Sequence, residues 1–234
     1  MPRHPRYAIY FVPRADSALY RFGADLLGYD AFKNAVLPFA DGIEMQIEGW
    51  KDITADPRKY GFHATLKAPI SLAAGRSETE LMTAVQEFAG IPRDHPVIAP
   101  AVRAIGSFIA IVPDTPSPAL QQLAADCVTA FDPFRAPLTE HDRARRNVSA
   151  LTNKQIEYLD RWGYPYVFEE FQFHMTLTGS LPAQRREIIL GILQTRFAAL
   201  DLHSLAVGEI ALLRQNNETS NFTVIAHLPL QAPN

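Results

Sequence analysis

The chain of 234 residues has a single cysteine, Cys127, so no disulfide can form within it. The spacing of apolar residues from 118 to 131 predicts a helix with Cys127 on its inner face, where the thiol acts as an ordinary core side chain. No apolar run approaches the roughly 20 residues of a membrane span. The N-terminal sequence MPRHPRYAIYFVP has too short an apolar run for a signal peptide and instead predicts a strand over residues 7–12. We therefore expect a cytoplasmic protein without a membrane partner.

Strong positive charge is also missing, since the formal net charge is −3. Proteins that hold a long polyanion usually present a positive field, so the composition argues against long nucleic acid as a partner. A small phosphorylated ligand stays compatible, because one pocket can be basic on an acidic protein. The hydrophobic share of 47% and the charged share of 20% are typical of a soluble globular protein with a sizeable core.

Two stretches share one pattern: residues 60–67 read YGFHATLK and residues 171–178 read FQFHMTLT. In an extended strand, alternate side chains point to opposite faces. The apolar side chains of both stretches are therefore expected in the core. The polar side chains expected on the open faces are His63, Thr65 and Lys67 in the first strand, and His174, Thr176 and Thr178 in the second.

Similar elements follow each motif. After the first come a capping-box sequence at 77–80 with a helix, then strand-like runs at 97–105 and 108–112 around Gly106-Ser107. After the second come a helix to about residue 200 and strands at 204–213 and 222–228. Two lobes related by a pseudo-two-fold axis would bring the polar faces together. We predict an α+β fold, bilobal and duplicated, with two antiparallel sheets, helices packed outside and a central cleft.

Lobe boundaries follow from this pattern. Residues 1–131 are predicted to form the N-terminal lobe, 132–149 a connection and 150–234 the C-terminal lobe, all in one bilobal domain. A second capping box at 152–155 begins the helix of the C-terminal lobe. The connection is polar and broken by prolines. A solvated, partly helical segment is the plainer interpretation of it, and a phosphate-binding patch is the alternative. The candidate arginine ligands are Arg21, Arg135, Arg143, Arg145 and Arg146.

The paired motif fits acid–base chemistry at phosphorus. Histidine titrates near neutral pH, so one imidazole can accept a proton while the other donates one. Each threonine lies roughly 6–7 Å along its strand from the histidine, close enough to donate to a phosphate oxygen held between the histidines. Lys67 would add positive charge. The scheme needs no metal and no cofactor. One His-x-Thr triplet is common by chance, so the hypothesis rests on two copies, each preceded by Phe and followed by Leu.

The two copies, FHATL at 62–66 and FHMTL at 173–177, resemble the twin H-x-[ST]-x motifs of the two-histidine (2H) phosphoesterase superfamily. The longer contexts, YGFHATLKAP at 60–69 and WGYPYVFEEFQFHMTLTG at 162–179, look like a bacterial branch found with phosphonate-utilisation operons. The resemblance implies a duplicated fold with a central cleft and metal-independent phosphodiester chemistry. It also implies that His63 and His174 are the acid/base pair and that Thr65 and Thr176 bind phosphate.

The sequence therefore predicts a metal-independent phosphodiesterase that hydrolyses a small cyclic phosphate, either a 2′,3′-cyclic nucleotide or a cyclic ribose phosphate, in phosphonate metabolism. Tyr60, Tyr166 and Thr178 are candidate substrate contacts, with packing as the alternative role of the tyrosines. Three other functions stay open: an RNA end-processing or ligase-like activity, a nucleotide or phosphate-ester binding protein without turnover, and a metal-dependent hydrolase that uses Glu169 and Glu170. The motifs do not decide which histidine is the base.

Overall fold

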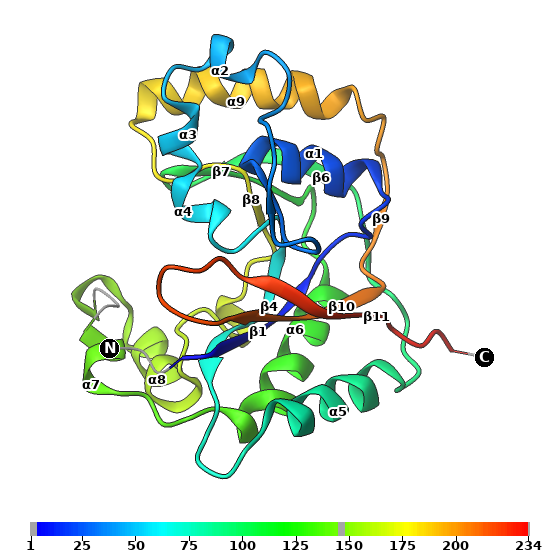
Figure 1. The fold of residues 1–234 in the computed structure, drawn as a ribbon, viewed down its shortest axis with the longest axis vertical. Coiled ribbons are helices and arrows are strands. Elements are labelled where there is room, and N and C mark those ends of the chain that lie inside the picture. The colour runs from blue at the N-terminus through cyan, green and yellow to red at the C-terminus, as the bar shows by residue number, and fades with distance from the viewer. Residues whose placement is uncertain (1–3, 145–147, 234) are drawn as a thin grey trace.

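The computed structural model describes residues 4–144 and 148–233 (Figure 1). The strands are β1 (Arg6–Phe11), β2 (Tyr29–Asp30), β3 (Ala35–Val36), β4 (Ala64–Ser71), β5 (Val97–Ile98), β6 (Pro100–Ile105), β7 (Phe108–Pro113), β8 (Met175–Thr176), β9 (Leu205–Ala206), β10 (Glu209–Gln215) and β11 (Thr223–Pro229). The α-helices are α1 (Ala18–Leu27), α2 (Ile43–Gln46), α3 (Trp50–Ile53), α4 (Ala55–Arg58), α5 (Glu78–Ala89), α6 (Pro118–Phe131), α7 (Glu140–Ala144), α8 (Asn153–Trp162) and α9 (Ala183–Ala198). Short 3-10 helices are η1 (Asp132–Phe134), η2 (Val148–Ala150) and η3 (Phe168–Glu170).

A large antiparallel sheet runs through the described chain in the order β11-β10-β1-β4-β8-β7-β6. Two smaller antiparallel pairs, β2-β3 and β5-β9, lie outside it. The mixture of helices with antiparallel strands agrees with the predicted α+β class. The strands that were expected in two separate sheets are instead joined into one, because β4 pairs with β8.

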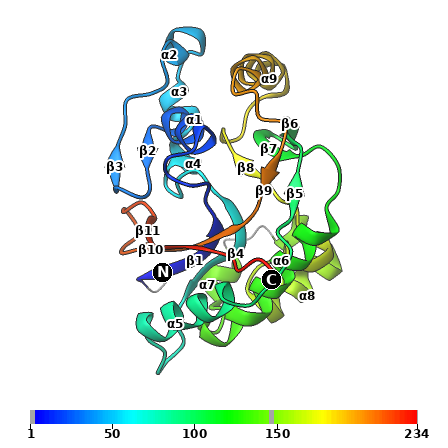
Figure 2. The ribbon, with the colours of Figure 1, turned by 90° about the vertical axis from the view of Figure 1, so that its right-hand side faces the viewer.

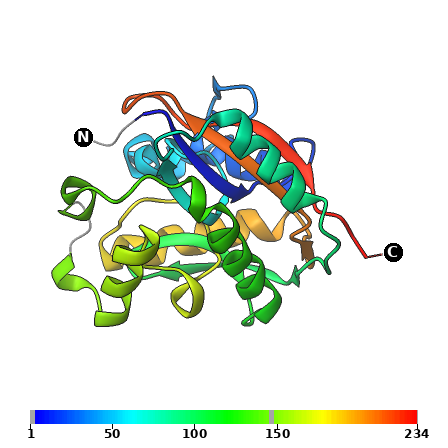
Figure 3. The same ribbon diagram turned by 90° about the horizontal axis from the view of Figure 1, so that it is seen from below.

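Strands from the two ends of the sequence lie side by side in this sheet. Tyr7 of β1 pairs with Arg214 of β10, and Figure 3 shows the blue N-terminal strand beside the orange and red C-terminal ones. The sheet therefore alternates between strands from residues 1–131 and strands from residues 150–234. The division into two lobes stays a prediction. The duplication with a pseudo-two-fold axis stays a prediction.

Helices cover the sheet in two groups. α5 packs against β10 and β11, α6 packs against β4, and α9 packs against β6 and β7. Figure 2 shows α1, α2 and α9 on one side of β1, β10 and β11, with α5 and α6 on the other. The core between these layers includes the fully buried rings of Phe11, Phe62 and Phe131. Cys127 is buried there too, as its helical spacing predicted.

Several local predictions are confirmed. Ser77 and Glu80 form the capping box of α5, and Thr152 and Gln155 form that of α8. The predicted hairpin around Gly106-Ser107 is the β6–β7 pair. Among the helices that the structure describes, none combines the length and apolar character that a membrane span requires.

The second motif forms a much shorter strand than the sequence predicts. The paired strand contains only Met175–Thr176, although the alternating pattern covers residues 171–178. The amides of Leu177 and Thr178 both donate to the same carbonyl, that of Ile109, at 2.9 and 3.3 Å. Two successive donors on one acceptor interrupt the regular ladder, so β8 ends at residue 176.

Candidate active site

β4 and β8 meet through one pair of Cα partners, Ala64 and Met175, whose side chains are fully buried. In an antiparallel pair, the positions on either side of such partners also face each other, and their side chains lie on the opposite face. Continuing this register by one residue on each side would set His63 beside Thr176 and Thr65 beside His174. Directly opposed Cα atoms in such a ladder are about 4.5–5.5 Å apart. The two His-x-Thr pairs therefore form a single group at the junction.

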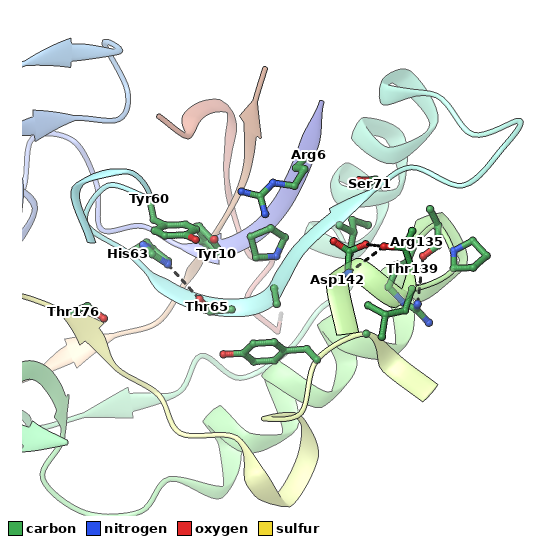
Figure 4. Close-up of a pocket in the computed structure, with 18 of the residues that line it drawn as sticks. Arg6, Tyr10, Tyr60, His63, Thr65, Ser71, Arg135, Thr139, Asp142 and Thr176 are labelled. Carbon is green, nitrogen blue, oxygen red and sulfur yellow. Dashed lines mark hydrogen bonds between the residues drawn. The ribbon is translucent and has the colours of Figure 1, made fainter. Parts of the chain in front are cut away.

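This group lies in a cleft with a volume of about 520 Å³. All four motif side chains line it, together with side chains from β1, from the end of β4 and from the segment that follows η1. In Figure 4, Tyr60, His63 and Tyr10 gather at one end of the cleft and Arg135, Thr139 and Asp142 at the other. The cleft is large enough for a mononucleotide or a sugar phosphate.

The imidazole of His63 is held in one orientation. Its Nδ1 lies 2.9 Å from the carbonyl oxygen of Gly61. Because a carbonyl oxygen only accepts, Nδ1 carries the proton and Nε2 of the neutral ring is an acceptor. The Thr65 hydroxyl donates to this Nε2 at 3.2 Å. Tyr10 stacks on the ring, with centroids 3.8 Å apart and planes inclined by 20°.

His174 repeats this arrangement. Its Nδ1 lies 2.8 Å from the carbonyl oxygen of Gln172, two residues earlier, as Gly61 is from His63. Nδ1 is therefore the protonated nitrogen, and Nε2 is the one available to a ligand. The ring of Phe108 packs against it at 5.6 Å between centroids. Both histidines thus have the same tautomer and the same backbone support.

Burial favours the neutral form of both imidazoles. It lowers the pKa of His63 to about 4; the hydrogen bond to Gly61 opposes this shift, and the nearby His174 adds to it. Burial also lowers the pKa of His174, against the hydrogen bond to Gln172. An anionic group bound between the rings would favour the protonated form again, because opposite charges at short range stabilise each other.

Lys67 does not reach the cleft, which corrects the prediction that it shares a face with His63 and Thr65. β1 pairs Tyr10 with Thr65 but Ile9 with Lys67, so β4 has one extra residue in this interval. Such a bulge changes the face to which the following side chains point. The buried Lys67 ammonium donates to Val128 O and to Asp132 Oδ1, both at 2.9 Å. Lys67 and Asp132 therefore form a structural ion pair beneath α6.

The other predicted contacts are divided. Tyr60 lines the cleft and stacks on Phe222, with centroids 5.3 Å apart. Tyr166 is exposed and does not line the cleft, although it packs edge-on against the cleft residue Tyr164. Thr178 is fully buried, where its hydroxyl accepts from Ile109 N and donates to Gly179 O. These bonds make Thr178 part of the backbone framework and not a ligand group.

The candidate arginines are engaged elsewhere or exposed. Arg135 lines the cleft, but its Nε donates to Asp132 Oδ1 at 2.8 Å. Arg143 pairs with Asp160, and Arg21 is exposed on α1. The two remaining candidates, Arg145 and Arg146, lie outside the described residues.

The glutamates considered as metal ligands also have other partners. Glu169 accepts from the hydroxyl of Tyr158, and Glu170 accepts from the amide of Gln155. Neither glutamate lines the cleft with the histidines. Across residues 4–144 and 148–233, no three side chains of His, Cys, Asp or Glu are grouped so as to hold a metal ion.

Sequence reasoning missed several cleft residues, and two of them, Tyr10 and Arg6, come from β1. The regular pairing of β1 with β10 places them on the same face, four residues apart. The alternation of RYAIYF contains this signal. The sequence does not show that β1 lies beside the strand of the first motif, and only that pairing brings these two side chains to the histidines.

The fold and this cleft define an α+β protein in which two His-x-Thr pairs share one site. Residues 65–223 match the family described as protein of unknown function (DUF1045), and the chain belongs to that family.

Two curated relatives are each named ribose 1,5-bisphosphate phosphokinase PhnN. The protein from Janthinobacterium sp. (strain Marseille) is 34% identical over 233 residues, which cover 96% of this chain and 50% of that protein. The protein from Laribacter hongkongensis (strain HLHK9) is 34% identical over 184 residues, covering 75% of this chain and 40% of that protein. The chain thus spans half or less of the length of these relatives. A crystal structure of a phosphoesterase aligns with 98% of this chain and 99% of its own, at 12% identity and a TM-score of 0.42.

Proposed function

We propose that this protein is a metal-independent phosphodiesterase that opens a small cyclic phosphate, with His63 and His174 as the acid–base pair. The observation that carries the proposal is the pairing of Ala64 with Met175, which sets both His-x-Thr pairs on one face and in one cleft. The matching tautomers add support, because each histidine has its Nε2 available to a ligand. Two such groups on either side of a phosphate are what in-line displacement requires.

The proposed step balances as follows. Water attacks phosphorus and gives a proton to Nε2 of His63 as the new P–O bond forms. The ring P–O bond breaks on the opposite side, and the departing sugar oxygen takes a proton from Nε2 of His174, which enters the step as the imidazolium favoured by the bound anionic phosphate. The product is a phosphomonoester, and exchange with solvent restores both histidines. We assign the base to His63 because its Nε2 already accepts a hydrogen bond from the Thr65 hydroxyl, and its pKa of about 4 favours the same unprotonated state.

Thr65 and Thr176 are proposed to donate to the non-bridging phosphate oxygens. In the free protein the Thr65 hydroxyl donates to His63 Nε2. A phosphate oxygen would replace that acceptor, which frees the Nε2 lone pair to take the proton from water. Donors directed at the charge that develops in the transition state typically account for about 10²–10³-fold in rate each.

We propose a cyclic ribose phosphate as the preferred substrate, in phosphonate metabolism, with 2′,3′-cyclic nucleotides as the second class to test. The support is chemical. If a cyclic phosphate spans O1 and O2 of ribose, cleavage of its bond to O2 leaves a phosphate monoester on O1. Ribose 1,5-bisphosphate, the compound in the names of the two relatives, also has a phosphate monoester on O1. Phosphokinase activity is not part of the proposal, because this chain has no Gly-Lys dipeptide and so lacks the phosphate-binding loop sequence G-x-x-x-x-G-K-[ST].

Hydrolysis of both substrate classes, followed by ³¹P NMR in the presence of a chelator, tests this function. We expect turnover by the wild type and none by the double variant His63→Ala/His174→Ala. The matched control is His203→Ala, because His203 is exposed and bonded to Asp201. Equal rates for the wild type and the double variant on every substrate would overturn the proposal. Loss of turnover on chelation would indicate a metal-dependent hydrolase, and tight binding without turnover a binding protein.

A further inference from the structure

Arg6 presents a positive charge to the cleft without a carboxylate partner among the described residues. It lines the same cleft as the two histidines. Its protein hydrogen bonds go to the neutral amide of Gln215, and its guanidinium lies over the ring of Phe222, 5.5 Å from the centroid. No acidic side chain of residues 4–144 or 148–233 forms a salt bridge with it.

The other arginine of the cleft, Arg135, already has a carboxylate partner. Asp132 accepts from Nε of Arg135 at 2.8 Å and also binds the buried ammonium of Lys67. Asp142, the carboxylate of the cleft lining, accepts from the hydroxyl of Thr139 near the same end as Arg135. Among the described arginines that line this cleft, Arg6 is therefore the one without a carboxylate partner.

The guanidinium of Arg6 is held in place before any ligand binds. The side-chain Nε2 of Gln215 donates to Ser220 O at 2.7 Å, which fixes the amide so that Oε1 faces Arg6. That oxygen accepts from Nε and Nη2 of Arg6, the first at 2.9 Å. Of the five N–H groups of a guanidinium, both on Nη1 and one on Nη2 make no hydrogen bond to the described protein. A guanidinium group with three unused N–H donors is suited to bind the oxygens of a phosphate.

Arg6 lies at a useful distance from the histidines. It shares one face of β1 with Tyr10, which stacks on His63. Four residues of strand separate their Cα atoms by roughly 14 Å. Figure 4 shows the Arg6 side chain extending from β1 back towards Tyr10, which shortens this distance. Burial raises the pKa of Tyr10 well above its ordinary value, and the charge of Arg6 opposes that rise, so the two groups interact.

We propose that Arg6 binds a second phosphate of the substrate, on the side of the sugar away from the reacting cyclic phosphate. The preferred ligands are then sugar phosphates with two phosphate groups, and not cyclic phosphates with one. The inference rests on the proposed function for the placement of the first phosphate between the histidines. In the proposed substrate, a ribose whose cyclic phosphate spans O1 and O2, the second phosphate would be on O5, at the other end of the sugar.

Calorimetric binding of two monoesters tests this inference without requiring turnover. The probes are ribose 1-phosphate and ribose 1,5-bisphosphate, and neither contains a phosphodiester bond. We expect the wild type to bind the bisphosphate roughly ten- to hundred-fold more tightly, the range typical of hydrogen bonds to charged groups. In Arg6→Gln that ratio should fall to within about threefold of one. Arg6→Lys keeps the charge without the guanidinium group and should fall between the two.

The matched control is Arg14→Gln, since Arg14 is exposed beyond the other end of β1 and paired with Asp16. Arg14→Gln should keep the wild-type ratio of the two affinities. Added salt should reduce this ratio only in variants that retain Arg6. Equal affinity of the wild type for the two probes, or an Arg6→Gln variant with the wild-type ratio and an unchanged melting temperature, would overturn the inference. Because neither probe has a phosphodiester bond to hydrolyse, the binding ratio can be interpreted even if the phosphodiesterase assay shows no turnover.

Discussion

Ala64 of β4 and Met175 of β8 form the Cα pair that joins the two strands carrying the His-x-Thr motifs. Both side chains are fully buried, so the face on which they lie is fixed by the core. The opposite face receives two histidines and two threonines from segments about half the chain apart. The site therefore depends on one point of strand pairing, and the two histidines should act as one unit.

Replacement of either histidine by alanine should lower kcat/KM for the cyclic phosphate by about 10³-fold, and the double variant should lose little more. The reason is that proton removal from water and proton delivery to the leaving oxygen belong to one displacement, so a lone acid or base contributes little. Steady-state kinetics of the two single variants and the double variant check this, with His203→Ala as the control. Independent effects that multiply in the double variant contradict it.

The pH dependence follows from the two pKa shifts. The base must be neutral and the acid protonated, and kcat/KM reports the pKa values of the free enzyme. Burial lowers the pKa of His63 to about 4 and that of His174 below the ordinary 6.5. As pH rises through the pKa of His174 the acid is lost, so kcat/KM should be lower at pH 8 than at pH 6. A profile that rises over this interval would count against His174 as the acid.

The sequence predicted the helices with good caps, the β6–β7 hairpin and the similarity of the two motifs, because those features depend on neighbouring residues. It did not predict the position of Lys67, because strict alternation assumes a regular strand and the extra residue in β4 is defined only by its pairing with β1.

Cleft residues supplied by β1 were missed for a related reason. Tyr10 and Arg6 reach the histidines because β1 pairs with β4. The paired residues of these two strands are more than fifty positions apart in the sequence. The placement of β10 and β11 beside β1 is likewise a long-range pairing. Local patterns in one sequence indicate strands but do not say which strands are neighbours.

Thr176 and Thr178 are a matched pair for separating function from stability. Thr176→Val should lower kcat about 10²-fold with little change in stability, because its hydroxyl is proposed to face the phosphate. Thr178→Val should leave kcat/KM near the wild-type value but cost about 1–3 kcal/mol, because the buried amide of Ile109 loses its acceptor. Kinetics and urea unfolding of both variants measure the two effects. If Thr178→Val lowered kcat and Thr176→Val lowered only stability, Thr178 would be the threonine that contacts the phosphate.

Lys67 and Asp132 should matter for folding and not for turnover. Asp132→Ala leaves an ammonium with a 4% exposed side chain without its counter-charge, which should cost about 3 kcal/mol. Lys67→Met removes that charge and keeps the volume, so it should be milder, and the double variant should be more stable than Asp132→Ala alone. Urea unfolding gives the three values. Lys67→Met should retain kcat/KM within about threefold, and a loss of 10²-fold would return Lys67 to the catalytic scheme.

Gly23 of α1 connects helix packing to the first histidine. A Cβ built on Gly23 would lie 2.1 Å from Cγ of Phe62, the residue just before His63. Phe62 is fully buried, so its ring has little room to move. Gly23→Ala should therefore cost about 1–3 kcal/mol despite the better helix propensity of alanine, and it should lower kcat because His63 moves with Phe62.

Gly191 of α9 is the control for Gly23, since nothing lies within 4 Å of a Cβ built there. Gly191→Ala should stabilise the protein by about 0.5–1 kcal/mol through helix propensity alone and leave kcat unchanged. Thermal unfolding and kinetics of the two variants separate packing from propensity. If Gly23→Ala behaves like Gly191→Ala in both measurements, α1 does not press Phe62 into place, and the position of His63 is set by β1 and the Gly61 carbonyl alone.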